Sequence, residues 1–280
     1  MQIQRLMGKV AVGIGLAVLA GGAASQSEGF FAKAISAYPD IEFPRAYKEF
    51  GFLGASGNGI YKPEGVGPFP AVVLVHTCGG LQPHMSDRAK ELVAAGFVVL
   101  LLDSYGPRNH TAFCQPTGVG APRVYKDAFD ALKHLATLKE VQPERIYVVG
   151  LSLGSFVAST AASPGVAKAA GGEKRFRASV GWYGSCAFTP KMGPVWDLVR
   201  PDTDQPLLLL MAKEDKETPI APCFPLLPEM KAAGKPVAWH VYDNATHGWD
   251  KGMPDRGYVL NREVTKDAMA KTIEFLNANQ

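Results

Sequence analysis

Continuous apolar runs that alternate with stretches of helical spacing dominate the chain after residue 59. Runs such as 71–75 and 97–102 lack polar alternation, which is typical of strands buried on both faces of a parallel sheet. The predicted strands are 47–52, 59–61, 71–75, 97–102, 145–149, 177–183, 206–212 and 237–242. The predicted helices are 86–95, 122–139, a small-residue helix that follows the 145–149 strand and ends near 162, 224–233 and 263–277. Strands that alternate with helices predict an α/β fold, with a mostly parallel sheet and right-handed crossovers.

The Gly- and Pro-rich stretch 184–205 is the longest irregular segment between these elements. We expect it to form a loop over the carboxyl edge of the sheet and not a linker between domains. It leaves no room for a large helical cap. Residues 46–280 are therefore predicted to form a single α/β domain, preceded by an N-terminal extension at 25–45.

The first 24 residues have the pattern of a signal peptide. Arg5 and Lys9 give a positive start, 10–20 is an apolar run, and 22–25 offers small residues for cleavage. The apolar run is short for a transmembrane helix. We expect cleavage and export to the periplasm or the medium, without stable membrane insertion of the mature protein. An uncleaved anchor and a buried terminal helix are the alternatives.

Composition narrows the function classes. The chain has 280 residues, of which 47% are hydrophobic and 20% charged, so a packed core is expected and wholesale disorder is not. The formal net charge is +3 and no Lys/Arg run stands out, so nothing indicates nucleic-acid binding. Four cysteines permit two disulfides in three pairings, with buried free thiols as the alternative. Without a Cys-x-x-Cys pair, neither a zinc site nor a thioredoxin-like motif is indicated.

A Gly-x-Ser-x-Gly motif at 150–154 gives the first candidate for chemistry. The motif alone is weak evidence for a nucleophile, but here a predicted buried strand precedes it and a small-residue helix follows it. Such a sharp turn lifts the Ser152 hydroxyl clear of the sheet, and it places the backbone N–H of Leu153 at a helix N-terminus. We predict Ser152 as a nucleophile and Leu153 as an oxyanion donor. A Gly-rich turn with a capping serine is the alternative.

A serine nucleophile needs a base and an orienting acid, which follow in the order Ser, Asp or Glu, His on this type of scaffold. His247 lies just past the last predicted strand and is the predicted base, whereas His240 lies within that strand and is predicted to be structural. Asp215 follows the 206–212 strand and is the predicted acid, with Glu214 as its competitor. The neighbouring charged residues are predicted to be solvated: Lys213, Lys216 and Glu217.

A second oxyanion donor is expected from the loop 76–81, whose glycines allow the backbone to turn towards the nucleophile. The N–H of Cys78 is the predicted donor, with Thr77 or Gly79 as alternatives. His76 is predicted to be architectural.

Together these segments resemble the dienelactone hydrolase family over most of residues 45–278. The segments that carry the resemblance are 75–81, 102–108, the Ser152 turn, 215–219 and 246–248. The resemblance implies the α/β-hydrolase fold, little or no cap, no metal, and hydrolysis of an ester or lactone. The founding members use a cysteine nucleophile with a glutamate in the loop that corresponds to the one near Thr77. This chain has Ser152 and no acid there, which favours an ordinary Ser-His-Asp esterase arrangement.

The resemblance also implies a pairing for the cysteines. In the family's sheet order, the strands before Cys78 and Cys114 are neighbours, and so are those before Cys186 and Cys223. We therefore expect the disulfides Cys78–Cys114 and Cys186–Cys223, close to the active-site edge.

The sequence thus predicts a serine hydrolase without a cofactor, whose partner is a small or medium carboxylic ester or lactone. An acyltransferase or a peptidase would use the same triad, and a non-catalytic binding protein on a hydrolase scaffold is the alternative of another class. Arg108, His110 and His84 are candidates for lining the entrance, with loop hydrogen bonding as the alternative. The pattern does not indicate an oligomeric state.

Overall fold

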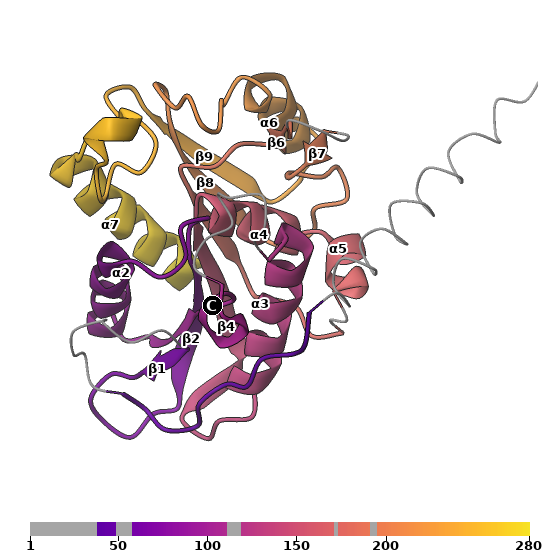
Figure 1. The fold of residues 1–280 in the computed structure, drawn as a ribbon. Helices are drawn as coiled ribbons and strands as arrows, with labels where there is room; N and C mark the ends of the chain where they lie inside the picture. The colour runs from indigo at the N-terminus through magenta and orange to yellow at the C-terminus, as the bar shows by residue number, and fades with distance from the viewer. Residues whose placement is uncertain (1–37, 49–57, 111–118, 171–172, 191–194) are drawn as a thin grey trace, which may run out of the picture.

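The computed structural model describes residues 38–48, 58–110, 119–170, 173–190 and 195–280. Within these residues the main sheet has seven strands in the order β1-β3-β2-β4-β5-β8-β9, drawn in Figure 1. β1 is antiparallel to β3, and all other neighbours are parallel. The strands are β1 (Gly59–Tyr61), β2 (Phe69–Val75), β3 (Val98–Leu102), β4 (Val141–Leu151), β5 (Ser179–Trp182), β8 (Leu207–Ala212) and β9 (Val237–Tyr242). The predicted α/β architecture is confirmed.

Helices cover both faces of this sheet, as the continuous apolar runs predict. α2 (Pro83–Ala94) and α7 (Arg262–Ala278) lie on one face, and α3 (Ala121–Leu135) and α4 (Leu153–Ala161) lie on the other (Figure 1). Successive β2 residues point to opposite faces, so Val73 packs in the core of α3 and α4 while Val72 packs in the core of α2 and α7. A third apolar cluster joins α6 (Cys223–Ala232) to β8 and β9.

The structure differs from the predicted elements at three places. The predicted helix 122–139 ends at Leu135, because its last residues tighten into turns in which Leu138 N–H donates to the Leu135 carbonyl. A short helix, α5 (Pro164–Ala169), begins where the Ser163 hydroxyl caps Val166 N–H. The predicted loop 184–205 contains the two-residue strands β6 (Ala187–Phe188) and β7 (Trp196–Asp197).

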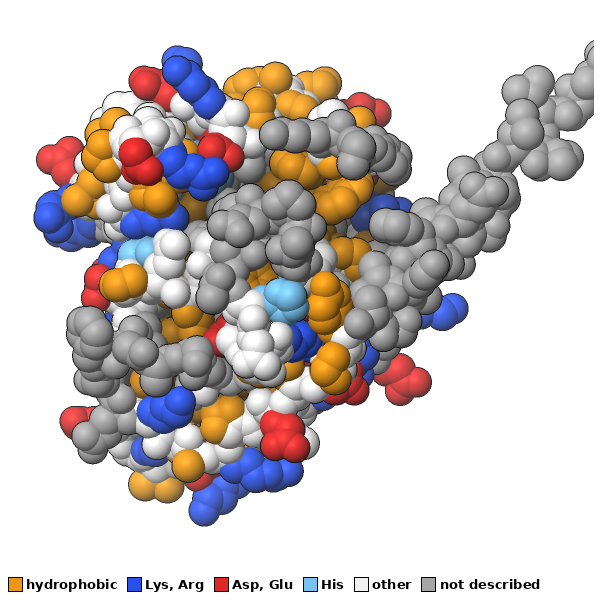
Figure 2. Space-filling view, in the orientation of Figure 1, with side chains coloured by type: hydrophobic (Ala, Val, Ile, Leu, Met, Phe, Trp, Pro, Cys, Tyr) orange, Lys and Arg blue, Asp and Glu red, His pale blue; other side chains and the backbone are white. Residues whose placement is uncertain are grey.

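Of the predicted strand 47–52, only the start is described, where Tyr47 pairs with Ile60 of β1. The predicted signal peptide 1–24 lies outside the described residues. No helix in the described part of the chain combines the length and hydropathy that a membrane crossing requires. On the face drawn in Figure 2, basic and acidic side chains are interspersed, in keeping with the small net charge.

The segment 38–48 is attached to α3 through a buried ionic cluster. The Asp127 carboxylate accepts two hydrogen bonds from the Arg108 guanidinium, at 2.7 and 2.9 Å, and one from Arg123 Nε at 3.0 Å. The side chain of Asp127 has no exposed surface, and those of both arginines are 2% exposed. The arginines also donate to the carbonyls of Pro39 and Tyr38. This cluster therefore joins the N-terminal segment, the turn after β3 and α3.

We predict that Asp127→Ala lowers the free energy of unfolding by about 3–5 kcal/mol, because it removes the buried carboxylate that pairs with Arg108 and Arg123, of which Arg123 retains its pair with the exposed Asp40. Urea unfolding followed by circular dichroism measures this change. Asp130→Ala is the matched control on the same helix: its carboxylate is 20% exposed and pairs with Lys126, so its loss is expected to cost less than about 1 kcal/mol. Equal costs for the two substitutions would contradict a dominant role for the buried cluster.

Candidate active site

Ser152 occupies a strained turn between β4 and α4. Its backbone has φ 55° and ψ −111°, a conformation that residues with a Cβ rarely adopt. The turn directs the Ser152 hydroxyl away from the sheet at the carboxyl end of β4, while its own N–H donates to the Trp182 carbonyl of β5. The side chain remains nearly buried, with 7% of the residue exposed.

Two glycines make this turn possible by letting the chain pack on itself. A Cβ on Gly150 would lie 1.9 Å from the carbonyl oxygen of Gly154, and a Cβ on Gly154 would lie 2.3 Å from the carbonyl oxygen of Val75. Both positions therefore exclude any side chain. Steric exclusion therefore explains both glycines of the motif. Their lack of a side chain lets α4 pack directly against β2.

A continuous chain of hydrogen bonds links three of the predicted site residues. Ser152 Oγ lies 2.9 Å from His247 Nε2, and His247 Nδ1 lies 2.8 Å from Asp215 Oδ2. Asp215 and His247 are 7% and 5% exposed. The carboxylate fixes the tautomer with the proton on Nδ1, which leaves Nε2 able to accept the serine proton.

The Asp215 carboxylate is held by contacts with its own loop. Asp215 Oδ1 accepts from the backbone N–H groups of Glu217 and Thr218, at 2.9 and 2.8 Å, and Oδ2 lies 2.8 Å from the Thr218 hydroxyl. The competitor Glu214 is exposed, and its backbone N–H donates to the Ala245 carbonyl. That last bond joins the loop after β8 to the loop after β9, which brings Asp215 and His247 together.

The loop 76–80 lies beside Ser152 at the end of β2. Buried His76 accepts from Ser104 N–H at Nε2 and so donates through Nδ1 to the Thr77 carbonyl at 2.7 Å. Burial lowers the pKa of His76, which keeps the ring neutral in this architectural role. The Gly79 N–H is already taken by the Thr77 hydroxyl at 3.2 Å. Of the two alternatives to the Cys78 N–H, Gly79 is therefore committed elsewhere.

A small cavity opens above the Ser152 hydroxyl, with about 350 Å³ of empty space that includes the solvent at its mouth. Thr77, Cys78 and Gly79 line it on the side of β2, together with Tyr183 from the end of β5. The other lining residues are the one that precedes α2 and four from the segment after His247: Gln82, Lys251, Met253, Arg256 and Tyr258. Leu153 is the first residue of α4, so its N–H has no acceptor within the helix.

Sequence reasoning missed the cationic wall of this cavity. Lys251 donates to Gln82 Oε1 at 2.9 Å, and both Lys251 and Arg256 lie against the Tyr258 ring, at 5.9 and 5.7 Å from its centroid. Burial lowers the pKa of Lys251. The position of Lys251, four residues after the predicted base His247, was the signal in the sequence that could have indicated this wall.

The earlier candidates for the entrance lie elsewhere. Arg108 is turned into the cluster with Asp127, and His84 is buried at the start of α2, where burial lowers its pKa to about 4. His110 contacts the Tyr38 ring edge-on at 5.8 Å. His240 lies in β9 against Tyr242, in keeping with its predicted structural role.

The cysteine prediction is confirmed for one pair. Cys186 and Cys223 form a disulfide, which connects the segment after β5 to the first residue of α6. Cys78 is also disulfide-bonded, and its predicted partner Cys114 lies outside the described residues. Among the described residues, no group of three or more His, Cys, Asp and Glu has an arrangement suited to a metal ion.

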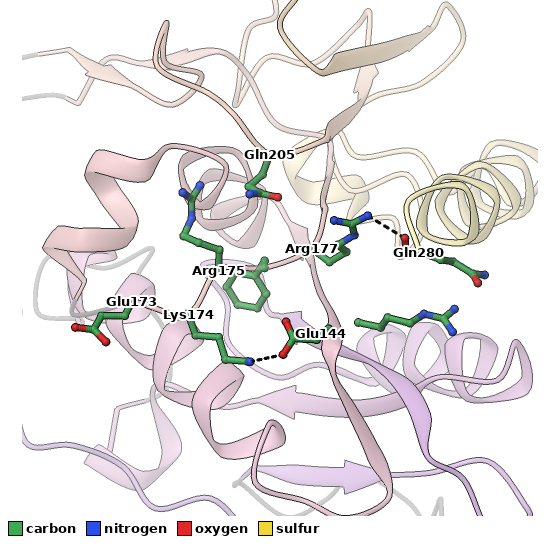
Figure 3. Close-up of a pocket in the computed structure, with 9 residues that line it drawn as sticks. Glu144, Glu173, Lys174, Arg175, Arg177, Gln205 and Gln280 are labelled. Atoms are coloured by element: carbon green, nitrogen blue, oxygen red, sulfur yellow. Dashed lines mark hydrogen bonds and ion pairs between the residues drawn. The ribbon is translucent and has the colours of Figure 1, made fainter.

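A larger, open hollow lies at the opposite edge of the sheet, near the amino ends of β4 and β5 (Figure 3). Three of its charged side chains have partners. Lys174 lies 3.5 Å from Glu144, Arg175 pairs with Asp204 at 2.8 Å, and Arg177 donates to the Gln280 carbonyl at 2.9 Å. The hollow is separate from the Ser152 cavity, and the two share no lining residue.

Comparison with known proteins agrees with this geometry. The model of the dienelactone hydrolase family matches residues 58–280. The esterase EstD of Thermotoga maritima is 35% identical over 130 residues, covering 42% of this chain and 30% of that protein. A probable 2-oxo-3-(5-oxofuran-2-ylidene)propanoate lactonase of Bradyrhizobium sp. is 28% identical over 144 residues, covering 47% of this chain and 54% of that protein. The matches thus span about a third and about half of these relatives.

Solved structures share the fold. Esterase 2 of Thermogutta terrifontis, phosphonylated by cyclosarin, superposes with a TM-score of 0.60 at 16% identity, covering 79% of this chain and 88% of that one. The dienelactone hydrolase-like promiscuous phosphotriesterase P91, from metagenomic libraries, gives a TM-score of 0.59 at 16% identity, covering 79% and 92%. The predicted α/β-hydrolase fold is confirmed.

Proposed function

Since this chain belongs to the dienelactone hydrolase family, we propose that it is a serine hydrolase that cleaves small carboxylic esters or lactones. The observation that carries the proposal is the series of hydrogen bonds from the Ser152 hydroxyl through His247 to Asp215. Ser152 and His247 line the cavity in which a substrate would bind. The names of the two curated relatives, an esterase and a lactonase, support the same reaction class.

The geometry supports a two-step mechanism. Ser152 Oγ attacks the substrate carbonyl while His247 Nε2 takes its proton, and the N–H groups of Leu153 and Cys78 donate to the developing oxyanion. The protonated imidazole then delivers that proton to the leaving alkoxide, which departs and leaves the acyl group on Ser152. In the second step, His247 takes a proton from water as the water oxygen attacks the acyl carbonyl. The bond between the acyl carbon and Ser152 Oγ then breaks, the imidazolium returns the proton to Ser152 Oγ, and the carboxylic acid is released. Asp215 stabilises the imidazolium in both steps.

The size of the cavity supports the substrate class. The cavity beside Ser152 is small, since its empty space of about 350 Å³ already includes the solvent at its mouth, so a short acyl or alcohol group fits better than a long chain. Tyr183 and Tyr258 place their rings edge-on against the imidazole, each at 5.1 Å between centroids, and they restrict the space beside it.

We expect a fluorophosphonate probe to label the wild-type protein and to abolish hydrolysis of p-nitrophenyl acetate, because an activated serine attacks phosphorus as it attacks a carbonyl. Ser152→Ala should lower kcat by at least about 10⁴-fold and prevent labelling. Ser159→Ala is the control, since Ser159 is buried on the same helix away from His247. Labelling of Ser152→Ala at the wild-type rate would exclude the mechanism.

The cationic wall extends the proposal to substrates that carry a negative charge. Lys251 and Arg256 line the cavity. Arg256 lies 3.8 Å from Glu217 in a partly exposed pair, whereas Lys251 contacts the neutral side chains of Gln82 and Tyr258. A carboxylate on the substrate would therefore be attracted to Lys251 more than to Arg256. Because burial lowers the pKa of Lys251, this attraction is lost at a lower pH than an ordinary lysine would allow.

We predict that Lys251→Met raises KM for a p-nitrophenyl hemisuccinate by about fivefold, a change of about 1 kcal/mol, and leaves KM for the neutral acetate nearly unchanged. In the wild type, the preference for hemisuccinate should decline as the pH rises towards the lowered pKa of Lys251, because the ammonium group then loses its proton. Lys216→Met, an exposed control, should change neither constant. An unaltered ratio of the two KM values in Lys251→Met would contradict the role of this charge.

We further propose that residues 1–24 direct export and are removed, leaving residues 46–280 as the hydrolase domain. The N-terminal pattern supports this, and so does the Cys186–Cys223 disulfide, since disulfides persist in oxidising compartments. Intact mass of the protein from the periplasm of a Gram-negative host should correspond to a chain that begins near residue 25. A full-length chain retained in the cytoplasm would contradict the proposal.

A further inference from the structure

Tyr183 stands out among the residues around the candidate site because its backbone is strained. It follows β5 directly and has φ 36°, in the left-handed region that a residue with a Cβ rarely occupies. Strain of this kind persists only where the surroundings hold it in place. Its N–H donates to the Leu210 carbonyl of β8, so the sheet continues to position the backbone here.

The ring of Tyr183 lies against the imidazole of the proposed base. The two centroids are 5.1 Å apart and the planes meet at 69°, an edge-on contact. The Tyr183 ring also meets Trp249, at 4.8 Å and 86°. The ring therefore contacts both His247 and Trp249, which lie two residues apart in the chain.

A buried ionic group fixes the outer end of the same side chain. The Tyr183 hydroxyl donates to Asp250 Oδ1 at 2.9 Å, and Asp250 Oδ2 lies 3.5 Å from Arg88 Nη1. The Asp250 side chain has no exposed surface. Burial raises the pKa of Tyr183 well above its ordinary value, so the hydroxyl remains a donor over the working pH range. Arg88 is held in turn by Glu91, with contacts of 2.7 and 2.9 Å.

The backbone of Tyr183 reaches the proposed acid as well. Its carbonyl oxygen lies 3.1 Å from the Thr218 hydroxyl, which is also 2.8 Å from Asp215 Oδ2. Thr218 has one hydroxyl proton, which serves one of these acceptors at a time. Tyr183 thus contacts His247 through its ring. Through its carbonyl it contacts the Thr218 hydroxyl, which lies beside Asp215.

We propose that Tyr183 is a positioning residue for His247, anchored by a second buried chain that runs from Arg88 through Asp250 to the Tyr183 hydroxyl. The inference rests on the proposed hydrolase function. During the reaction, the imidazole must give its proton to the leaving group without swinging away from Asp215. A neighbouring ring that is fixed at its outer end limits that swing, and small displacements of reacting groups cost rate more than binding.

Three substitutions test the proposal by steady-state hydrolysis of p-nitrophenyl acetate. Tyr183→Phe removes only the hydroxyl, and we expect it to lower kcat about tenfold while KM changes less than twofold. Asp250→Ala should lower kcat to a similar extent. Asp250→Asn keeps an oxygen acceptor for Tyr183, so its kcat should stay within about threefold of the wild type.

Tyr242→Phe is the matched control. Tyr242 also donates from its hydroxyl to a carboxylate, Asp267, at 2.7 Å, and it packs against the same Trp249 at 5.4 Å. Its loss should lower the melting temperature without changing kcat. A merely structural role for Tyr183 predicts that both phenylalanine variants behave alike.

Each outcome either supports the positioning role of Tyr183 or overturns it. If folded Tyr183→Phe has the kcat of Tyr242→Phe, the proposal is overturned. If Tyr183→Phe does not fold, the two Asp250 variants provide the test. Equal kcat values for Asp250→Ala and Asp250→Asn would then overturn the proposal. Failure of the proposed function is a separate result, since the wild type would then neither hydrolyse the ester nor take up the fluorophosphonate.

Discussion

The close contact between α4 and the central strands is the constraint on which the site depends. The helix approaches β2 so closely that a Cβ on Gly154 would lie 2.3 Å from the Val75 carbonyl oxygen. That approach lets the chain reverse between β4 and α4 at Ser152, and it places the first N–H groups of α4 beside the loop that follows β2. The strain at Ser152 is offset by packing on both faces of the sheet, where the residues around it are almost fully buried.

Parallel strand order brings the other groups to the same edge. β8 and β9 are neighbours, so the loops that follow them leave the sheet together and share the backbone bond from Glu214 N–H to the Ala245 carbonyl. This bond holds the two loops that carry Asp215 and His247 next to one another. Asp215 Oδ1 then accepts hydrogen bonds from the backbone N–H groups of Glu217 and Thr218, which compensate for the burial of its carboxylate.

The order of motifs along the chain was sufficient to predict the fold and the residues of the hydrogen-bonded chain, because a buried strand before Ser152 and a loop after the last strand leave few alternatives. The sequence favoured Asp215 over Glu214, and the structure adds the physical reason: the Asp215 carboxylate faces the Glu217 and Thr218 N–H groups and His247, whereas Glu214 is exposed. Tyr183 escaped prediction because its strained backbone and its contact with Asp250, 67 residues later, leave no local pattern. The two-residue strands β6 and β7 are too short to show a period.

The serine at the centre of the site explains why so much of the surrounding structure supports one imidazole. A cysteine is intrinsically nucleophilic as a thiolate, whereas a serine hydroxyl needs a base already in contact with it. Ser152 has that contact at 2.9 Å, and the loop that faces it is neutral, with the Thr77 hydroxyl serving the Gly79 N–H. The imidazole contacts Asp215, Tyr183 and Tyr258, and its Nε2 lies against the Ser152 hydroxyl. In the proposed mechanism such a site gains its reactivity from the fixed position of the base, and the hydrogen bonds from Asp215 to His247 and from Tyr183 to Asp250 are the contacts that would hold that position.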